Sequence, residues 1–378
     1  MLSTVLGIVV TATGILLLVG ATLATQDWWD RHFLPLYFSA HAKQLLIERL
    51  ARLAMAALGL ALVLFVRPTL RRATERKSSR EIAASGLRIA LAVILALAVS
   101  EWTMGRKFAF AAAETQPGEQ PVRQPDPRLG WVFAPSHQGT ITVGGRRISY
   151  STDSHGYRVR GPDGPVDVTQ PTLVFTGESI IAGYGLNWEE TIPALAGAAL
   201  QMQSANIAVF GYANDQAYLR LVSELPRFRQ PRAVVSLFVP SLFARNLGDD
   251  RPHLGPGLTW MPARHRLWVH ALFRFLVPYH SQPEIEQGIA NMRAQLMASQ
   301  ALARAHGAIP LIVVPQFGPE LPVEQMLRRR ILDGQSYVQV QLDPDWHLQG
   351  DLHPDPRAAQ AIAMAVVARL RAGFDSQR

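Results

Sequence analysis

Cysteine is absent from the 378 residues of this chain. Its absence excludes thiol nucleophiles, cysteine-ligated metals and disulfides, and it is compatible with an oxidising compartment. The chain also lacks a G-x-G-x-x-G stretch at the start of a helix, so it has no phosphate loop of the dinucleotide-binding kind. We therefore expect no cofactor.

Acidic residues are scarce only in the first part of the chain. Residues 1–108 hold 13 Lys and Arg against 6 Asp and Glu, whereas the remainder holds 24 against 23. The formal net charge of +8 therefore belongs almost wholly to the N-terminal part. Because the larger part is close to neutral, we expect no nucleic-acid partner.

Three apolar stretches near the N-terminus are long enough to cross a bilayer. They cover residues 2–24, 45–66 and 82–102, and the second carries Glu48, Arg49 and Arg52 in its first part. The first stretch has no Lys or Arg ahead of its apolar core, and two more stretches follow it, so we do not expect a cleaved signal peptide. Residues 1–108 thus predict an integral membrane region.

The stretch between the second and third spans, residues 67–81, is a short loop with six basic residues. The loop between the first two spans carries only Arg31 and Lys43. By the positive-inside rule, the 67–81 loop lies in the cytoplasm and the chain after Trp102 emerges on the other side. The expected location is the cytoplasmic (inner) membrane, multi-pass, with the large domain in the periplasm or another extracytoplasmic space.

A Pro-rich linker, residues 109–127, precedes a domain at 128–378 in which strand and helix patterns alternate. Such alternation is typical of βαβ units and a parallel sheet covered on both faces. A hairpin is predicted around Gly144-Gly145. The predicted strands are 171–176, 205–210, 233–239, 308–314 and 337–340, and the predicted helices are 189–200, 216–225, 285–305 and 357–370. Residues 241–283 interrupt the alternation with aromatic and Arg residues. This insertion is either an extra helix on the core or a lid or membrane-facing element.

The stretch Gly177-Glu178-Ser179 lies between the first predicted strand and a helical pattern. A tight turn here places the Ser179 hydroxyl at the carboxyl edge of a parallel sheet, where backbone N–H groups can face a developing negative charge. A serine in a Gly-rich turn that caps a helix is the simpler interpretation of this stretch alone. The G-x-S-x-G elbow is not present, since the next glycine is Gly183.

Near the C-terminus, Asp351-Leu352-His353-Pro354 precedes the last predicted helix. A serine nucleophile needs a base, and the base needs a carboxylate to fix its tautomer. His353 and Asp351 supply both if this loop meets Ser179. A metal site built from these two residues with Asp345 and His347 has no recognised ligand spacing, so none is predicted.

Together these motifs resemble the SGNH (GDSL-like) hydrolase family over roughly residues 128–372. The resemblance implies a three-layer α/β/α domain with a mostly parallel, five-stranded, flavodoxin-like sheet. It also implies Ser179 as nucleophile and oxyanion donor, Gly211 in Asn206-Ile-Ala-Val-Phe-Gly211 as second oxyanion donor, His353 as base and Asp351 as its orienter. Leu129-Gly130-Trp131 and Ser154-His-Gly156-Tyr-Arg158 are similar to the stretch that precedes the first block in membrane-tethered members.

The chain departs from the family pattern at three points. Glu178 stands where the family has Asp, and Asp351 and His353 are two residues apart rather than three. The Gly-x-Asn-Asp block expected after the third strand is replaced by Pro240-Ser241. Asn214 or Asn246 could replace its side-chain oxyanion donor, although a turn or loop asparagine is the simpler interpretation of each.

Two functions follow from this pattern. The first is a membrane-tethered serine esterase or acyltransferase that acts on an acyl ester of a cell-envelope polysaccharide or lipid. The second is a catalytically silent binding or assembly module of the cell envelope, suggested by the missing third block. The sequence does not indicate a protein partner, the acyl group or the acceptor.

Overall fold

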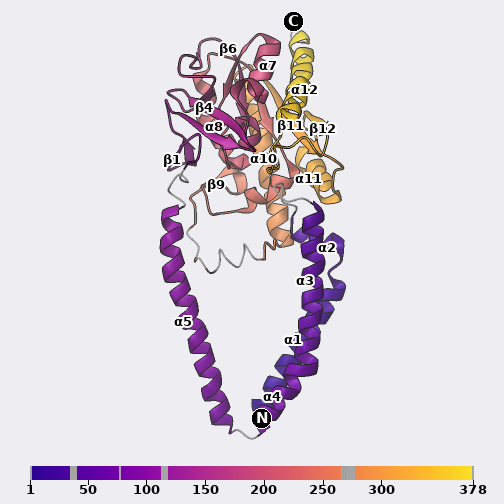
Figure 1. The fold of residues 1–378 in the computed structure, drawn as a ribbon. Helices are drawn as coiled ribbons and strands as arrows, with labels where there is room; N and C mark the ends of the chain where they lie inside the picture. Colours follow the sequence, from indigo (N-terminus) through magenta and orange to yellow (C-terminus); the bar gives the residue numbers. More distant parts are fainter. Residues whose placement is uncertain are drawn as a thin grey trace. The chain divides into compact units, whose positions relative to one another are not determined.

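The computed structural model describes residues 2–34, 41–75, 78–111, 118–264, 267, 269 and 277–376. The chain divides into two compact units, one made mainly of residues 1–109 and the other mainly of residues 110–378. Figure 1 shows the helices and strands that make up each unit.

The N-terminal unit is helical. Its elements are α1 (Leu2–Leu23), α2 (Gln26–His32), α3 (His41–Ala61), the π-helical turn η1 (Leu62–Val66), α4 (Arg67–Glu75) and α5 (Ser79–Ala111). Three helical segments are long and apolar enough to span a membrane: Thr4–Leu23, Ala42–Thr74 and Arg80–Thr103. They overlap the three predicted spans, the second extending beyond the predicted 45–66, and few of their side chains are buried within the structure.

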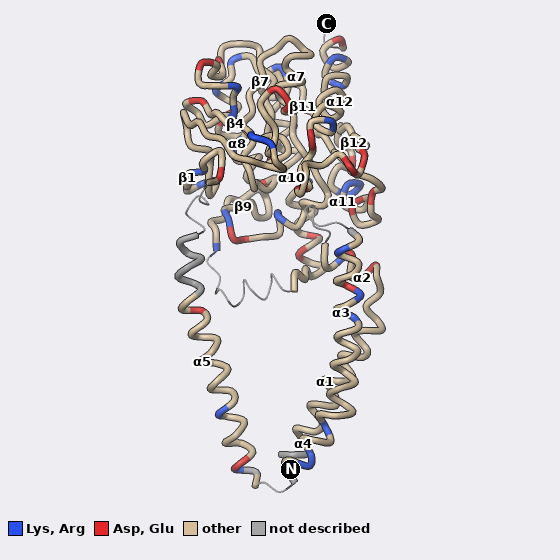
Figure 2. Tube along the Cα trace, in the orientation of Figure 1, with Lys and Arg blue, Asp and Glu red and all other residues tan. Residues whose placement is uncertain are grey.

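The predicted loop at 67–81 is wrong in its first half. Residues Arg67–Glu75 form helix α4, which continues α3 and η1 without a break, so Arg67, Arg71 and Arg72 lie on a helix. Figure 2 shows blue Lys and Arg positions on the tube at α4. Pro68 lacks a backbone N–H, yet it does not end the helix. The chain widens instead into a π-turn, in which Arg67 N–H donates to the Leu62 carbonyl.

Helices α1 and α3 pack through a pair of glycines. A methyl group added at Gly14 would lie 2.9 Å from the Gly59 carbonyl oxygen, and one added at Gly59 would lie 2.7 Å from the Gly14 carbonyl oxygen. Both distances are shorter than van der Waals contact, so only glycine permits this approach. Such small-residue contacts are typical of helix pairs in membranes.

The second unit is built on an eight-stranded sheet in the order β12-β11-β8-β6-β7-β5-β4-β3. Five strands are parallel: β6 (Pro171–Thr176), β7 (Gln203–Asn206), β8 (Gln230–Leu237), β11 (Ile309–Phe317) and β12 (Tyr337–Leu342). Numbered along the chain, their order is 2-1-3-4-5, which is the flavodoxin-like order. This confirms the predicted five-stranded parallel sheet.

The sheet is larger than predicted because three antiparallel strands extend it beyond β7. They are β3 (Gln138–Val143), β4 (Arg146–Thr152) and β5 (Arg158–Val159). The predicted hairpin is confirmed, since β3 and β4 are joined at Gly144-Gly145, both with positive φ. Strand β5 pairs with β7 through Arg158 and Asn206, which attaches the hairpin to the parallel sheet.

Helices cover both faces of the sheet. On one face, α7 (Ile192–Leu200) and α12 (Pro356–Asp375) contact each other; on the other, α10 (Gln282–Ala305) contacts α8 (Asn214–Glu224) and α11 (Pro322–Leu332). Alternation along β6 supplies both cores, because Leu173 and Phe175 join one buried cluster and Val174 the other. The three predicted layers are therefore present. Helix α11 was not predicted.

Other elements lie within the predicted linker and insertion. Strands β1 (Arg123–Asp126), which falls in the linker, and β2 (Gly130–Phe133) form an antiparallel pair. The described part of the insertion holds the 3₁₀ segments η4 (Pro240–Leu247) and η5 (Pro256–Leu258) and the strands β9 (His253–Leu254) and β10 (Trp260–Met261). The rest of the predicted insertion, including residues 270–276, lies outside the described residues.

Candidate active site

Ser179 lies at the carboxyl end of β6, where the sequence places it. It is the first residue of α6 (Ser179–Ala182), a single turn that begins after Gly177-Glu178 and ends at Gly183 with φ 78°. Glu178 is the N-cap residue, and its Oε1 accepts a hydrogen bond of 3.1 Å from the Ile180 N–H. This cap holds Ser179 in a buried position, with 4% of its surface exposed.

Asp351 and His353 lie in the loop between β12 and α12. His353 Nδ1 is 2.6 Å from Asp351 Oδ1, and the same oxygen accepts the His353 backbone N–H at 2.7 Å. Asp355, the N-cap of α12, accepts from the Ala358 N–H and fixes the end of this loop. One carboxylate oxygen thus holds both the imidazole and the backbone of His353.

The two loops meet. His353 Nε2 lies 2.7 Å from Ser179 Oγ, although the residues are 174 positions apart. Since Nδ1 faces a carboxylate, the proton on neutral imidazole belongs at Nδ1, and Nε2 is left as an acceptor for the serine hydroxyl. Ser179, His353 and Asp351 therefore form one hydrogen-bonded row.

The electrostatics of the row keep Asp351 ionised. Burial acts to raise the pKa of Asp351, but the hydrogen bonds from the His353 side chain and backbone outweigh it and bring the pKa below 3.8. The charge of Asp351 is therefore present throughout the neutral range and is lost only in strong acid. Tyr184 closes one side of the row, with its ring centroid 4.4 Å from that of His353.

The two backbone N–H groups that the sequence indicates as oxyanion donors lack acceptors. Within the described part of the chain, neither the Ser179 N–H nor the Gly211 N–H makes a hydrogen bond. Gly211 has φ 78°, and a methyl group added there would lie 3.3 Å from Trp131 Cζ2, so glycine is needed both for the turn and for the approach of the indole. Trp131 Nε1 donates to the Phe210 carbonyl at 2.9 Å and anchors this turn.

The two candidate asparagines do not reach Ser179 through any hydrogen bond found among the described residues. Asn214 Nδ2 donates to the Leu237 carbonyl at 2.9 Å, and Asn246 Oδ1 accepts the Asn214 N–H at 3.0 Å. Together they tie η4 to the start of α8. A side-chain oxyanion donor from either residue remains a prediction.

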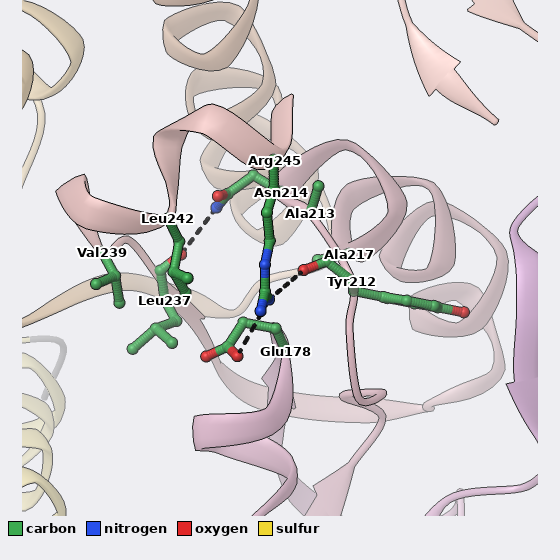
Figure 3. Close-up of a pocket in the computed structure, with 10 residues that line it drawn as sticks. Glu178, Tyr212, Ala213, Asn214, Ala217, Leu237, Val239, Leu242 and Arg245 are labelled. Carbon is green, nitrogen blue, oxygen red and sulfur yellow. Dashed lines mark hydrogen bonds and ion pairs between the residues drawn. The ribbon is translucent and has the colours of Figure 1, made fainter. Parts of the chain in front are cut away.

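A charged pair that was not predicted lies beside the serine. The Glu178 carboxylate, 7% exposed, has Oε2 2.6 Å from Ser179 Oγ and 3.8 Å from Arg245 Nη1. Figure 3 shows Arg245 extending from η4 toward Glu178 and the Tyr212 carbonyl, in a pocket whose other lining residues are mostly apolar. Burial lowers the pKa of Arg245, while the charge of Glu178 acts to raise it. In the sequence, the only indication of this charged pair is an arginine in the segment that replaces the third block.

A buried guanidinium holds the turn that follows Ser179. Arg158, on β5, is fully buried and donates to the carbonyls of Ala182, Gly183 and Leu186. Its guanidinium carbon lies 4.3 Å from the centroid of the Tyr150 ring. Burial lowers the pKa of Arg158 to about 10, while the charges of Tyr150, Glu189 and Glu190 act to raise it. The carbonyls at the end of α6 are thereby satisfied, which fixes the position of the serine turn.

Among the described residues, no group of three or more His, Asp or Glu side chains is arranged to hold a metal ion. The ring of His347 stacks on that of Phe317, with centroids 4.1 Å apart. Burial lowers the pKa of His347 below 6.5.

Comparisons with known proteins give structural neighbours only. No family model and no curated protein matches the sequence. The matching solved structures include lipolytic proteins of the G-D-S-L family, carbohydrate esterases and an arylesterase.

Three of these structures show how low the sequence identity and the TM-score are. A member of the lipolytic G-D-S-L family from Veillonella parvula is 8% identical, with 52% of this chain and 96% of that chain covered and a TM-score of 0.33. An acetyl xylan esterase from Butyrivibrio proteoclasticus is 12% identical, with coverage of 56% and 66% and a TM-score of 0.36. A family two carbohydrate esterase from Cellvibrio japonicus is 12% identical, with coverage of 62% and 80% and a TM-score of 0.33. At these scores the likeness assigns neither an activity nor a substrate to this chain.

Replacing Arg158 tests its role in holding the serine turn. Arg158→Met leaves the Ala182 and Leu186 carbonyls without their donor, while the Gly183 carbonyl keeps the Leu186 N–H, so we expect the free energy of unfolding to fall by about 3 kcal/mol. Arg160→Met is the matched control, because the Arg160 side chain is 73% exposed and pairs only at the surface with Glu189; we expect a change within about 0.5 kcal/mol. Urea unfolding of the detergent-purified chain, followed by tryptophan fluorescence, measures both. Equal stability of the two variants would contradict the assignment.

Proposed function

We propose that this chain is a membrane-anchored serine esterase or O-acyltransferase. Its substrate would be an acyl ester of a cell-envelope polysaccharide or lipid. The observation that carries the proposal is the hydrogen-bonded row of Ser179, His353 and Asp351 at the carboxyl edge of the sheet. The unpaired N–H groups of Ser179 and Gly211 support it, because they are suited to receive a developing oxyanion.

In the proposed reaction, Ser179 Oγ attacks the ester carbonyl carbon while His353 Nε2 takes the hydroxyl proton. Asp351 holds the imidazole in place and stabilises its positive charge. The carbonyl π electrons move onto oxygen, which the Ser179 and Gly211 N–H groups stabilise. When the C–O bond breaks, the imidazolium gives its proton to the leaving alcohol, and an acyl-Ser179 remains.

The second half of the reaction restores the enzyme. Water, for hydrolysis, or a sugar hydroxyl, for transfer, attacks the acyl carbon while His353 again takes a proton. Collapse of the tetrahedral intermediate returns that proton to Ser179 Oγ and releases an acid or a new ester. The choice of acceptor depends on what the site binds, not on the row itself.

A catalytically silent envelope-binding module is the second candidate. Two observations favour it: the side-chain amides of Asn214 and Asn246 bond elsewhere, and the Ser179 hydroxyl is also within hydrogen-bond distance of Glu178. Loss of one oxyanion donor costs about 100- to 1,000-fold in turnover. In this case, Ser179→Ala and His353→Ala would leave cellular function intact, whereas deletion of the domain would abolish it.

Covalent labelling with a fluorophosphonate probe distinguishes the two functions. We expect the wild-type chain to be labelled, Ser179→Ala to be unlabelled, and His353→Ala to be labelled at least about a thousandfold more slowly, because the serine loses its base. Ser154→Ala, at an exposed serine, is the control and should be labelled like the wild type. Failure of the wild type to react, or persistence of the label in Ser179→Ala, would exclude the proposed chemistry.

We also propose that the candidate active site lies outside the cytoplasm, in the periplasm or another extracytoplasmic space. The three candidate spans support this orientation, as do the six basic residues from Arg67 to Arg80, which lie at the end of the second candidate span, after it and at the start of the third. The membrane region would then tether the site close to envelope substrates.

Reporter fusions test this orientation. Alkaline phosphatase reaches its active, folded state only outside the cytoplasm. It should therefore be active when fused after residue 110 and inactive when fused after residue 77. A reporter that works only in the cytoplasm should show the reverse pattern at both positions. Phosphatase activity at 77 but not at 110 would overturn the orientation.

A further inference from the structure

The Glu178 carboxylate has two uses in this structure. Oε1 accepts the Ile180 N–H and caps α6, and Oε2 lies 2.6 Å from Ser179 Oγ. The family pattern has Asp at this position, whose side chain is one methylene shorter. The extra methylene lets one carboxylate cap the helix with one oxygen and reach the neighbouring hydroxyl with the other.

The Ser179 hydroxyl has one hydrogen and two acceptors. Glu178 Oε2 and His353 Nε2 lie 2.6 and 2.7 Å from Oγ, and the hydroxyl donates to only one of them at a time. When it donates to Nε2, the serine is ready to react, but two oxygens then face each other at 2.6 Å without a proton between them. When it donates to Glu178, Nε2 must itself carry a proton in order to bond with Oγ. Both ring nitrogens are then protonated, so the imidazole cannot accept the serine proton.

Arg245 gives the Glu178 carboxylate a different partner. Its Nη1 lies 3.8 Å from Oε2, longer than a hydrogen bond, so a small movement of the carboxylate toward the guanidinium exchanges one contact for the other. Arg245 donates to the Tyr212 carbonyl at 3.4 Å, and its side chain is 25% exposed (Figure 3).

The charged groups around this pair come from three segments. Glu178 precedes α6, Arg245 belongs to η4, and Asp351 and His353 come from the loop before α12. Arg251, which follows η4, acts on Arg245 through its charge and is paired with Asp250. Of these cations, Arg245 is the one that lies within 4 Å of the Glu178 carboxylate in the described residues.

We propose that Glu178 and Arg245 are positioning residues that decide which acceptor takes the Ser179 proton. Pairing with Arg245 draws the carboxylate away from the hydroxyl and leaves the hydroxyl to His353. Without Arg245, the uncompensated negative charge of Glu178 favours the doubly protonated imidazole, and the base is freed only at higher pH. Without the charge of Glu178, the base is free at lower pH. This inference rests on the proposed serine chemistry.

The rate of fluorophosphonate labelling of the full chain, measured against pH, tests the pair. We expect Glu178→Gln, which keeps an oxygen for the helix cap, to shift the acidic limb of the profile to lower pH by about one unit. We expect Arg245→Gln to shift it in the opposite direction by a similar amount. Arg245→Lys should restore the wild-type profile, and the double substitution should behave like Glu178→Gln. Arg227→Gln, at a half-exposed arginine paired with Glu224, is the control and should leave the profile unchanged.

The outcomes separate this inference from the function on which it rests. If the wild type is not labelled, both are overturned. If the wild type is labelled but Glu178→Gln leaves the acidic limb in place or moves it to higher pH, the proposed role of Glu178 and Arg245 is overturned and the serine chemistry stands. Tryptophan fluorescence of the purified variants shows whether each of them folds. If Arg245→Gln does not fold, the pH profile of Glu178→Gln alone tests the proposed role of the pair. Shifts of the same sign in both single variants also overturn the pair.

Discussion

The hydrogen bond between Ser179 Oγ and His353 Nε2 joins two segments that lie 174 residues apart. It depends on the parallel sheet, because parallel strands bring the loops at their carboxyl ends to one edge. It also depends on α12, which begins directly after the His353 loop and contacts α7, the helix that follows the serine turn.

Around the bond, charged side chains are held in place by contacts with other protein groups instead of by water. Arg158 is fully buried and holds the carbonyls that follow α6, and Asp351 holds His353 through both ring and backbone. Glu178 and Arg245 add a second carboxylate and a second guanidinium close to the hydroxyl. A group held in place this way needs little reorganisation when charge develops on a substrate, and this is the main source of electrostatic catalysis.

The sequence predicted the parallel sheet because buried strands such as Pro171–Thr176 are short apolar runs bounded by turn residues. It also predicted the apolar helices, since length and hydropathy suffice for them. The residues of the row were predicted from chemistry and from a family resemblance, and the structure brings them within hydrogen-bond distance. Their catalytic roles remain proposals.

What the sequence did not predict depends on distances in space. The reach of Glu178 to the neighbouring hydroxyl and of Arg245 from η4 follows from side-chain geometry, which no pattern of residue types encodes. The added strands β3, β4 and β5 were missed as parts of the sheet because β5 has only two residues. The continuation of α3 into α4 was missed because Pro68 usually marks a helix boundary, whereas here the π-turn absorbs it.

A crystal structure of the fluorophosphonate-treated chain is the most direct test of the central claim. The account predicts phosphorus bonded to Ser179 Oγ, with its phosphonyl oxygen about 2.7–3.1 Å from the Ser179 and Gly211 backbone nitrogens. It also predicts that His353 Nε2 remains within hydrogen-bond distance of the bonded Oγ. Phosphorus on any other residue, or an oxygen turned away from both nitrogens, would contradict it.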